Sequence, residues 1–119
     1  MKKIQSLENL LTICKEEKKS GKRIVMCHGV FDLLHVGHIK HFEKAKSFGE
    51  ILIVSITADK FVNKGPDRPA FNEDDRSDSL SAIKDVDYVV INKDFTATKL
   101  IQQIKPDIYC KGPDYKKKN

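Results

Sequence analysis

Two histidines, three residues apart and framed by glycines, are the side chains whose types and spacing best suit chemistry in this sequence. His35 and His38 lie in the segment of residues 29–38, which follows an apolar run and precedes an amphipathic one. This order predicts a turn between a buried strand and a helix, with both imidazoles on one face of the first helical turn. The exposed N–H groups of that turn, its positive dipole end and two imidazole donors together suit a phosphate group.

The elements that must position these histidines alternate along the chain. Four apolar runs predict strands, over residues 23–27, 51–57, 88–91 and 107–110. Four segments predict helices, over residues 6–19, from the histidines to residue 48, from Asn72 onward and over residues 96–104. We therefore expect an α/β fold with a mostly parallel sheet, in which the histidines lie at the carboxyl end of the first strand, where such sheets bind ligands.

Two further cations are candidates for binding phosphate. Lys64 lies in a polar loop, residues 63–69, that leaves the carboxyl end of the second predicted strand. Arg76 lies near the first turn of the next predicted helix, where a cation is unfavourable because of the helix dipole. An anionic ligand or a neighbouring acidic side chain would each explain this arginine.

Composition and charge bound the class of protein. The chain has 119 residues, of which 39% are hydrophobic and 33% charged, as expected for one globular domain. Its apolar runs are far shorter than the roughly 20 residues that span a membrane, and no signal-peptide core follows Lys2 and Lys3, so a cytoplasmic protein without a membrane partner is expected. The three cysteines, without a C-x-x-C pair, are expected to be reduced core residues.

The basic excess does not indicate a nucleic-acid partner. The 22 basic and 17 acidic residues give a net charge of +5, and the basic residues are scattered without interleaved aromatic side chains. A cluster of phosphate contacts together with a solvated surface accounts for this excess as well, so no nucleic-acid partner is expected.

Residues 29–38 resemble a known signature. They match the pattern G-x-F-D-x-x-H-x-G-H of the cytidylyltransferase-like nucleotidyltransferases at all six fixed positions, which are Gly29, Phe31, Asp32, His35, Gly37 and His38. Six fixed positions in ten residues, placed between a predicted strand and a predicted helix, form a specific match. An H-x-G-H motif alone would be a weak one.

The resemblance extends over residues 23–115. In this range the sequence is similar to one branch of the family, the adenylyltransferase domain of ADP-heptose synthase. The motifs that carry it are Lys64-Gly65, Arg68-Pro69, Arg76, residues 86–90 and Lys111-Gly112-x-Asp114-Tyr115. It implies a Rossmann-like three-layer α/β/α sandwich. It also implies a reaction that joins a nucleoside triphosphate to a phosphorylated sugar or polyol with Mg²⁺ and releases pyrophosphate. A homodimer is a further expectation.

The resemblance implies a role for each matching residue. The implied catalytic residues, which would contact phosphate oxygens or stabilise the transition state, are His35, His38, Lys64 and Arg76. The implied nucleotide- and substrate-binding residues are Gly29, Val30, Phe31, Asp32, Gly37 and Asp114. No protein residue is expected to be a dedicated metal ligand. A zinc site formed with His41, three residues beyond His38, explains fewer of the residues in the segment than a phosphate site does.

The predicted function is a nucleotidyltransferase that joins ATP to a sugar 1-phosphate, such as a heptose 1-phosphate. Two alternatives stay open: a CTP-dependent enzyme acting on glycerol 3-phosphate or a similar small phosphate, and a non-catalytic nucleotide-binding module. The second arises because the family has a later I-S-S/T-T-x-K/R element that helps to hold the triphosphate, and nothing after Tyr115 supplies it. We expect residues 1–119 to form a single domain without that element.

Overall fold

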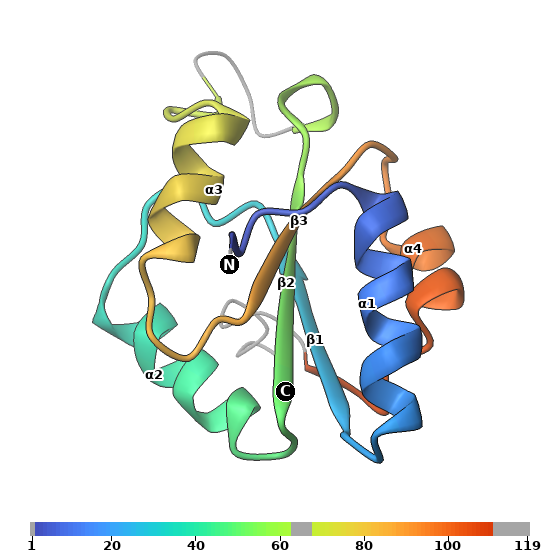
Figure 1. The fold of residues 1–119 in the computed structure, drawn as a ribbon. Coiled ribbons are helices and arrows are strands. Elements are labelled where there is room, and N and C mark those ends of the chain that lie inside the picture. The colour runs from blue at the N-terminus through green and yellow to red at the C-terminus, as the bar shows by residue number, and fades with distance from the viewer. Residues whose placement is uncertain (1, 63–67, 111–119) are drawn as a thin grey trace, which may run out of the picture.

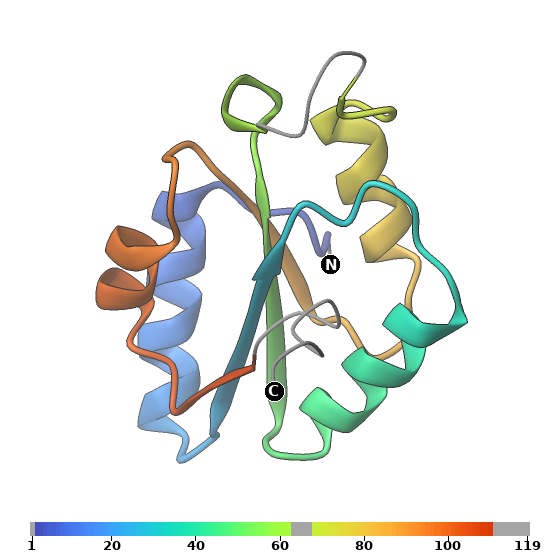
Figure 2. The same ribbon diagram turned by 180° about the vertical axis from the view of Figure 1, so that it is seen from behind.

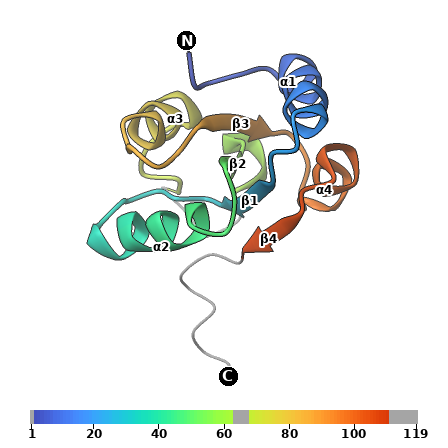
Figure 3. The ribbon, with the colours of Figure 1, turned by 60° about the horizontal axis from the view of Figure 1, so that its bottom comes forward.

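A four-stranded sheet lies between two pairs of helices in the computed structural model, which describes residues 2–62 and 68–110 (Figure 1). The strands are β1 (Ile24–Gly29), β2 (Ile51–Thr57), β3 (Tyr88–Asn92) and β4 (Ile108–Cys110). The helices are α1 (Leu7–Lys19), α2 (Val36–Lys46), α3 (Glu73–Ser81) and α4 (Thr98–Ile104), with a short 3₁₀ helix η1 (Asp59–Phe61) after β2. Helices α2 and α3 cover one face, and α1 and α4 cover the other (Figures 2 and 3).

All neighbouring strands are parallel, and their order is β3-β2-β1-β4. The chain therefore runs outward from β1 to β3 and then crosses back to place β4 on the other side of β1. The two directions separate between β1 and β4, where Cys27 pairs with Cys110. In open α/β sheets this switch point, outside the carboxyl ends of the strands, is the usual place for a ligand. The expected Rossmann-like α/β/α sandwich with a parallel sheet is confirmed.

Alternating side chains of each strand build two separate apolar cores. Val25 and Cys27 of β1 pack with Phe42 of α2 on one face. Ile24 and Met26 pack on the other face with residues of α1 and α4. All seven residues of β2 are buried, because both of its faces are covered by helices and both of its edges are paired. This burial explains the nearly continuous apolar run in the sequence.

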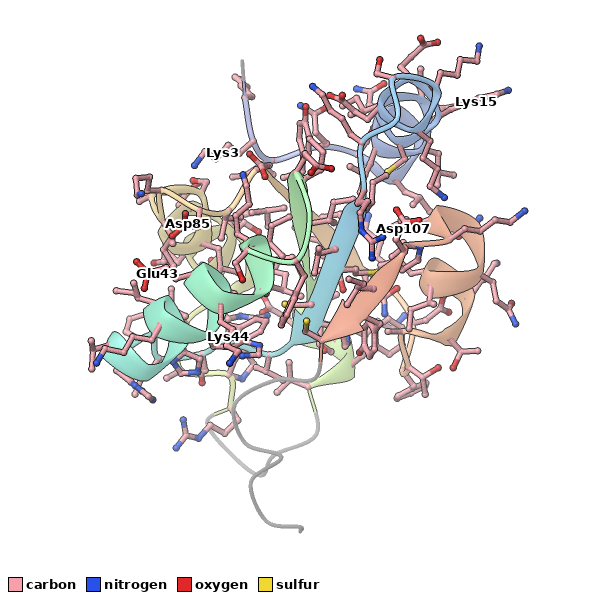
Figure 4. All side chains as sticks on the ribbon, turned by 90° about the horizontal axis from the view of Figure 1, so that it is seen from below. Lys3, Lys15, Glu43, Lys44, Asp85 and Asp107 are labelled. Carbon is pink, nitrogen blue, oxygen red and sulfur yellow. The ribbon has the colours of Figure 1, made fainter. Side chains whose placement is uncertain are left out.

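The observed element boundaries differ little from the expected ones. Ser6 caps α1, and its Oγ accepts the N–H of Asn9 at 3.2 Å. Strand β1 continues two residues beyond the apolar run, because His28 and Gly29 still pair with β2. Charged side chains project outward from the helical layers, among them Lys15, Glu43 and Lys44 (Figure 4). Among the described residues, no helix is long and apolar enough to cross a membrane.

Candidate active site

His35 and His38 cap the N-terminus of α2 in a reciprocal arrangement. His35 is the N-cap residue, and its Nδ1 accepts the backbone N–H of Gly37 at 2.9 Å. The Nδ1 of His38 in turn accepts the backbone N–H of His35 at 3.2 Å. The two ring centroids lie 4.2 Å apart. This is a capping box in which imidazoles take the places usually held by Ser or Thr and by Glu.

The capping contacts also determine which ring nitrogen carries the proton. A neutral imidazole has one acceptor nitrogen and one N–H donor. Because each Nδ1 accepts a backbone N–H, the neutral rings of His35 and His38 carry their proton on Nε2. Two imidazole donors are thereby fixed beside the positive end of a helix dipole, an arrangement that suits the oxygens of a phosphate chain.

The two glycines of the segment make room for its own aromatic rings. A Cβ at Gly37 would lie 2.6 Å from Cε1 of His35, and a Cβ at Gly29 would lie 3.0 Å from the ring of Phe31. The first distance is shorter than carbon atoms tolerate, and the second would require the phenyl ring to shift by a few tenths of an ångström. The sequence indicated that glycine lets the backbone approach a ligand, and the structure shows in addition a close approach of a protein ring at each position.

Phe31 supports His38 from within the core. Its ring is 7% exposed and packs edge-on against His38, with centroids 5.7 Å apart, and against Phe42 at 5.3 Å. Its backbone has a φ of +51°, a conformation that is uncommon outside glycine. The tight turn therefore buries the phenyl ring beneath the histidine, whereas the family resemblance implies a place in the lining of the nucleotide site.

Asp32 joins the histidine-bearing segment to the residues that precede α3. Its Oδ2 accepts the N–H of Ala70 at 2.7 Å and its Oδ1 accepts the N–H of Phe71 at 2.8 Å, while Nη1 of Arg68 lies 3.3 Å from Oδ2. Partial burial acts to raise the pKa of this carboxyl, but the hydrogen bonds from Ala70, Phe71 and Arg68 outweigh it and lower the pKa overall. The ionised carboxylate thus holds two loops together.

Arg76 is completely buried, and its guanidinium contacts protein groups. Nε donates to the carbonyl of Phe71 at 2.9 Å, and Nη1 donates to the carbonyls of Val30 at 2.9 Å and Thr57 at 2.8 Å. Nη2 donates to Oδ1 of Asp59 at 2.7 Å. Of the two explanations that the sequence left open, the neighbouring acid is the one found in the structure. The arginine lies beneath the surface, whereas the resemblance implies that it binds substrate phosphate.

Other candidates lie outside the site or outside the described residues. Lys64 and Asp114 belong to segments that the structure does not describe. His41 places Nε2 3.8 Å from Sγ of Cys27, in the core beside β1. Within residues 2–62 and 68–110, no group of three or more His, Cys, Asp or Glu side chains is arranged to hold a metal ion.

The cysteine thiols are free and mostly buried. Burial raises the pKa of Cys27 to about 12 and that of Cys14 to about 11, and it also raises the pKa of Cys110. Thiols of this kind stay protonated at neutral pH and react slowly, because the thiolate is the nucleophile. The cysteines therefore belong to the packing of the sheet.

Two polar features near the site lie outside the sequence signature. His28 is half-buried, with Nδ1 2.6 Å from Oγ of Ser55 and Nε2 3.4 Å from Oγ1 of Thr57. Burial lowers the pKa of His28, although an interaction with the backbone of Ser55 partly opposes this. The second feature is Asp59, which follows the second strand and pairs with Arg76. The signal for it in the sequence was an acidic residue two positions after the end of a buried strand.

A parallel sheet with two histidines capping a helix beyond the carboxyl end of β1 is the arrangement that the sequence predicted for a nucleotidyltransferase. The model of the cytidylyltransferase-like family matches residues 26–118. The chain belongs to this family of nucleotidyltransferases, as the G-x-F-D-x-x-H-x-G-H segment predicted.

Comparisons with known proteins agree with this assignment. The chain is 46% identical over 118 residues to the bifunctional protein HldE of Sulfurimonas denitrificans and 47% identical over 119 residues to that of Campylobacter jejuni subsp. doylei. Each match covers 98% of this chain and 25% of the relative, so the chain spans about a quarter of their length. A lipopolysaccharide core biosynthesis protein of Thermoplasma volcanium, known from its crystal structure, is 34% identical with a TM-score of 0.69, and the match covers 75% of this chain and 73% of that one.

Proposed function

We propose that this domain transfers the nucleotidyl group of ATP to a heptose 1-phosphate and releases pyrophosphate. The observation that carries the proposal is the reciprocal capping of His35 and His38, which orients both imidazoles at the N-terminus of α2, where the helix dipole favours a phosphate group. The choice of substrates is supported by the likeness of the loop motifs to the adenylyltransferase domain of ADP-heptose synthase. A sugar substrate also agrees with the similarity to the Thermoplasma volcanium protein, which belongs to lipopolysaccharide core biosynthesis.

The proposed reaction needs no nucleophile from the protein. An oxygen of the acceptor phosphate attacks the α-phosphorus of the nucleotide, the bond from that phosphorus to the α–β bridging oxygen breaks, and pyrophosphate leaves with the electron pair. The protein must bring two anions together and neutralise the charge that grows on the α-phosphate and on the leaving group. Catalysis of this kind depends on positioned hydrogen-bond donors.

The two histidines are suited to that task because they are oriented before substrate binds. Their Nδ1 atoms are engaged by backbone N–H groups, so neither ring has to be reoriented when charge develops. In this mechanism Nε2–H of His35 and of His38 donates to non-bridging oxygens of the triphosphate. Lys64 as a phosphate contact and Asp114 as a residue near the nucleotide or metal are proposals from the resemblance alone.

The described carboxylates near the histidines do not form a magnesium site by themselves. Asp32 is occupied by two N–H groups and Arg68, and Asp59 is occupied by Arg76. Magnesium in proteins is usually bound through one or two carboxylates together with substrate phosphates. We therefore propose that Mg²⁺ enters as part of the nucleotide substrate. A homodimer and a cytoplasmic location stay predictions.

A panel assay tests the substrate assignment. Pyrophosphate release from the 119-residue chain would be measured with Mg²⁺ and either ATP or CTP, across a set of sugar and polyol phosphates. The proposal predicts release with ATP and a heptose 1-phosphate above all other pairs. Release with CTP and glycerol 3-phosphate would instead establish the alternative cytidylyltransferase. Nucleotide binding by calorimetry without release from any pair would identify a non-catalytic module.

A further inference from the structure

Asp59 is the acidic partner of a cation that is fully buried. The side chain of Arg76 has 0% exposure, and that of Asp59 has 40%, with Nη2 and Oδ1 2.7 Å apart. The other three hydrogen bonds of the guanidinium go to uncharged backbone carbonyls. A buried charge is costly unless it is paired, so the Asp59 carboxylate is what allows a guanidinium to occupy this position.

The buried guanidinium joins three segments that are distant in sequence. It contacts Val30 in the histidine-bearing segment, Thr57 at the end of β2, and Phe71 before α3. The backbone of Phe71 is held from both sides, because its N–H donates to Asp32 and its carbonyl accepts from Arg76. These segments converge at the edge of the sheet beside α3 (Figure 1).

The contact with Val30 leads on to the histidines. Val30 directly precedes Phe31, whose backbone is held at a φ of +51° and whose ring packs 5.7 Å from that of His38. A shift of the Val30 carbonyl would therefore change the turn at Phe31 and move the surface on which His38 rests. Asp59 is itself fixed at the start of η1, where its N–H donates to Oε1 of Glu73 at 2.8 Å.

We propose that Asp59 is a positioning residue of the transferase site. It touches no substrate, and it acts through Arg76, Val30 and Phe31 on the orientation of His38. The expected effect on kcat rests on the proposed function, whereas the chain of contacts from Asp59 to His38 does not depend on it. Misplacement of a catalytic group by about 1 Å can cost on the order of 10²-fold in rate, so loss of the Asp59 charge should lower kcat more than it changes either KM.

Three variants of the full chain test this inference. Asp59→Asn keeps an oxygen acceptor but removes the charge, Asp59→Glu restores the charge, and Asp78→Asn removes a charge from an exposed position on α3. Each variant would be assayed well below its own melting temperature, so that only folded protein contributes. We expect kcat of Asp59→Asn to fall about 10²-fold, that of Asp59→Glu to recover in part, and that of Asp78→Asn to stay within twofold.

Amide hydrogen exchange provides a second readout that needs no activity. Peptides covering residues 29–33 and 68–76 should exchange several-fold faster in Asp59→Asn than in the unmodified chain, and at the same rate in Asp78→Asn. If the unmodified chain transfers no nucleotide, the proposed function fails, and the exchange measurement still tests the positioning role. A lower melting temperature of Asp59→Asn with unchanged kcat and unchanged exchange would overturn the inference, since a purely structural ion pair behaves in that way.

Discussion

The backbone N–H of His35 donates to Nδ1 of His38 at 3.2 Å, so one histidine of the pair orients the other. The Nδ1 of His35 is held in the same manner by the N–H of Gly37. Orientation of each imidazole thus comes from the helix terminus that also supplies the local positive potential. Three consequences of this histidine arrangement can be measured, and so can two consequences of the neighbouring residues Asp32 and His28.

The first prediction concerns the tautomers of the two rings. When the two rings are neutral, both should carry their proton on Nε2, because Nδ1 accepts a backbone N–H. Nitrogen chemical shifts of the histidine rings, measured by NMR on the free chain, report this directly. A predominant Nδ1–H form at either His35 or His38 would contradict the capping geometry.

Substitution of Gly37 should separate activity from stability. In Gly37→Ala the new Cβ would lie 2.6 Å from Cε1 of His35, so that ring must move and leave its N–H partner. The lost cap costs about 1 kcal/mol, and alanine regains nearly as much helix propensity, so the free energy of unfolding should change by less than about 1 kcal/mol. Turnover should nevertheless fall at least about tenfold, as when a positioned catalytic donor is lost.

Gly49→Ala is the matched control for that substitution. Its Cβ would lie 2.8 Å from the backbone oxygen of Arg23, before β1 and away from the histidines. Because backbone cannot swing aside as a side chain does, this variant should melt at a lower temperature while its folded fraction keeps full turnover. Equal turnover in Gly37→Ala and in the unmodified chain would show that the placement of His35 does not matter.

The sequence predicted the architecture because the decisive signals are local. Continuous apolar runs mark β1 and β2, and α1 and α3 begin directly after Ser6 and Asn72, which are residue types that cap helices. The end of β1 was missed, because His28 and Gly29 are not apolar and are retained in the strand only by pairing with β2. Ser55 is a polar residue that is completely buried within β2. Its partner, His28, is distant in sequence, so local sequence patterns do not explain it.

The site was predictable only where its contacts are short-range. His35 and His38 were found because their spacing of three residues has a meaning on a helix. Asp32 could be singled out, but two of its partners are backbone N–H groups, which every residue except proline provides. The ion pair of Arg76 with Asp59 spans 17 residues and depends on how β2 and α3 pack. No spacing rule at the sequence level encodes such a contact.

Asp32 should give the stability of the protein a defined pH dependence. Its pKa is lowered in the folded state from an ordinary value of 3.8, so the folded protein favours the ionised carboxylate. The stabilisation is therefore complete above the unfolded pKa and is lost as pH falls through the folded pKa. Urea unfolding should show Asp32→Asn less stable than the unmodified chain at neutral pH, with the difference shrinking below about pH 4. Glu43→Gln, exposed on α2, should show no such difference.

His28 should also make the stability of the protein depend on pH, at higher pH than Asp32 does, and the cause is the burial of its ring. Burial lowers its pKa from 6.5, so the folded state favours the neutral ring while the unfolded state still binds a proton. Stability is then complete above the unfolded pKa and falls as pH drops through about 6.5 toward the folded value. His41, whose pKa burial also lowers, adds a share of the same sign. His28→Gln should lose less stability between neutral and mildly acid pH, and an equal loss in both proteins would refute this origin.

The most direct test of the account is the turnover of His38→Ala. With MgATP and the best acceptor of the panel, removal of one transition-state donor should lower kcat about 10²- to 10³-fold. Calorimetry should show that the variant still binds nucleotide, and its melting temperature should stay close to that of the unmodified chain. A His38→Ala variant that releases pyrophosphate at the unmodified rate would contradict the claim that the capped histidine pair carries the transfer.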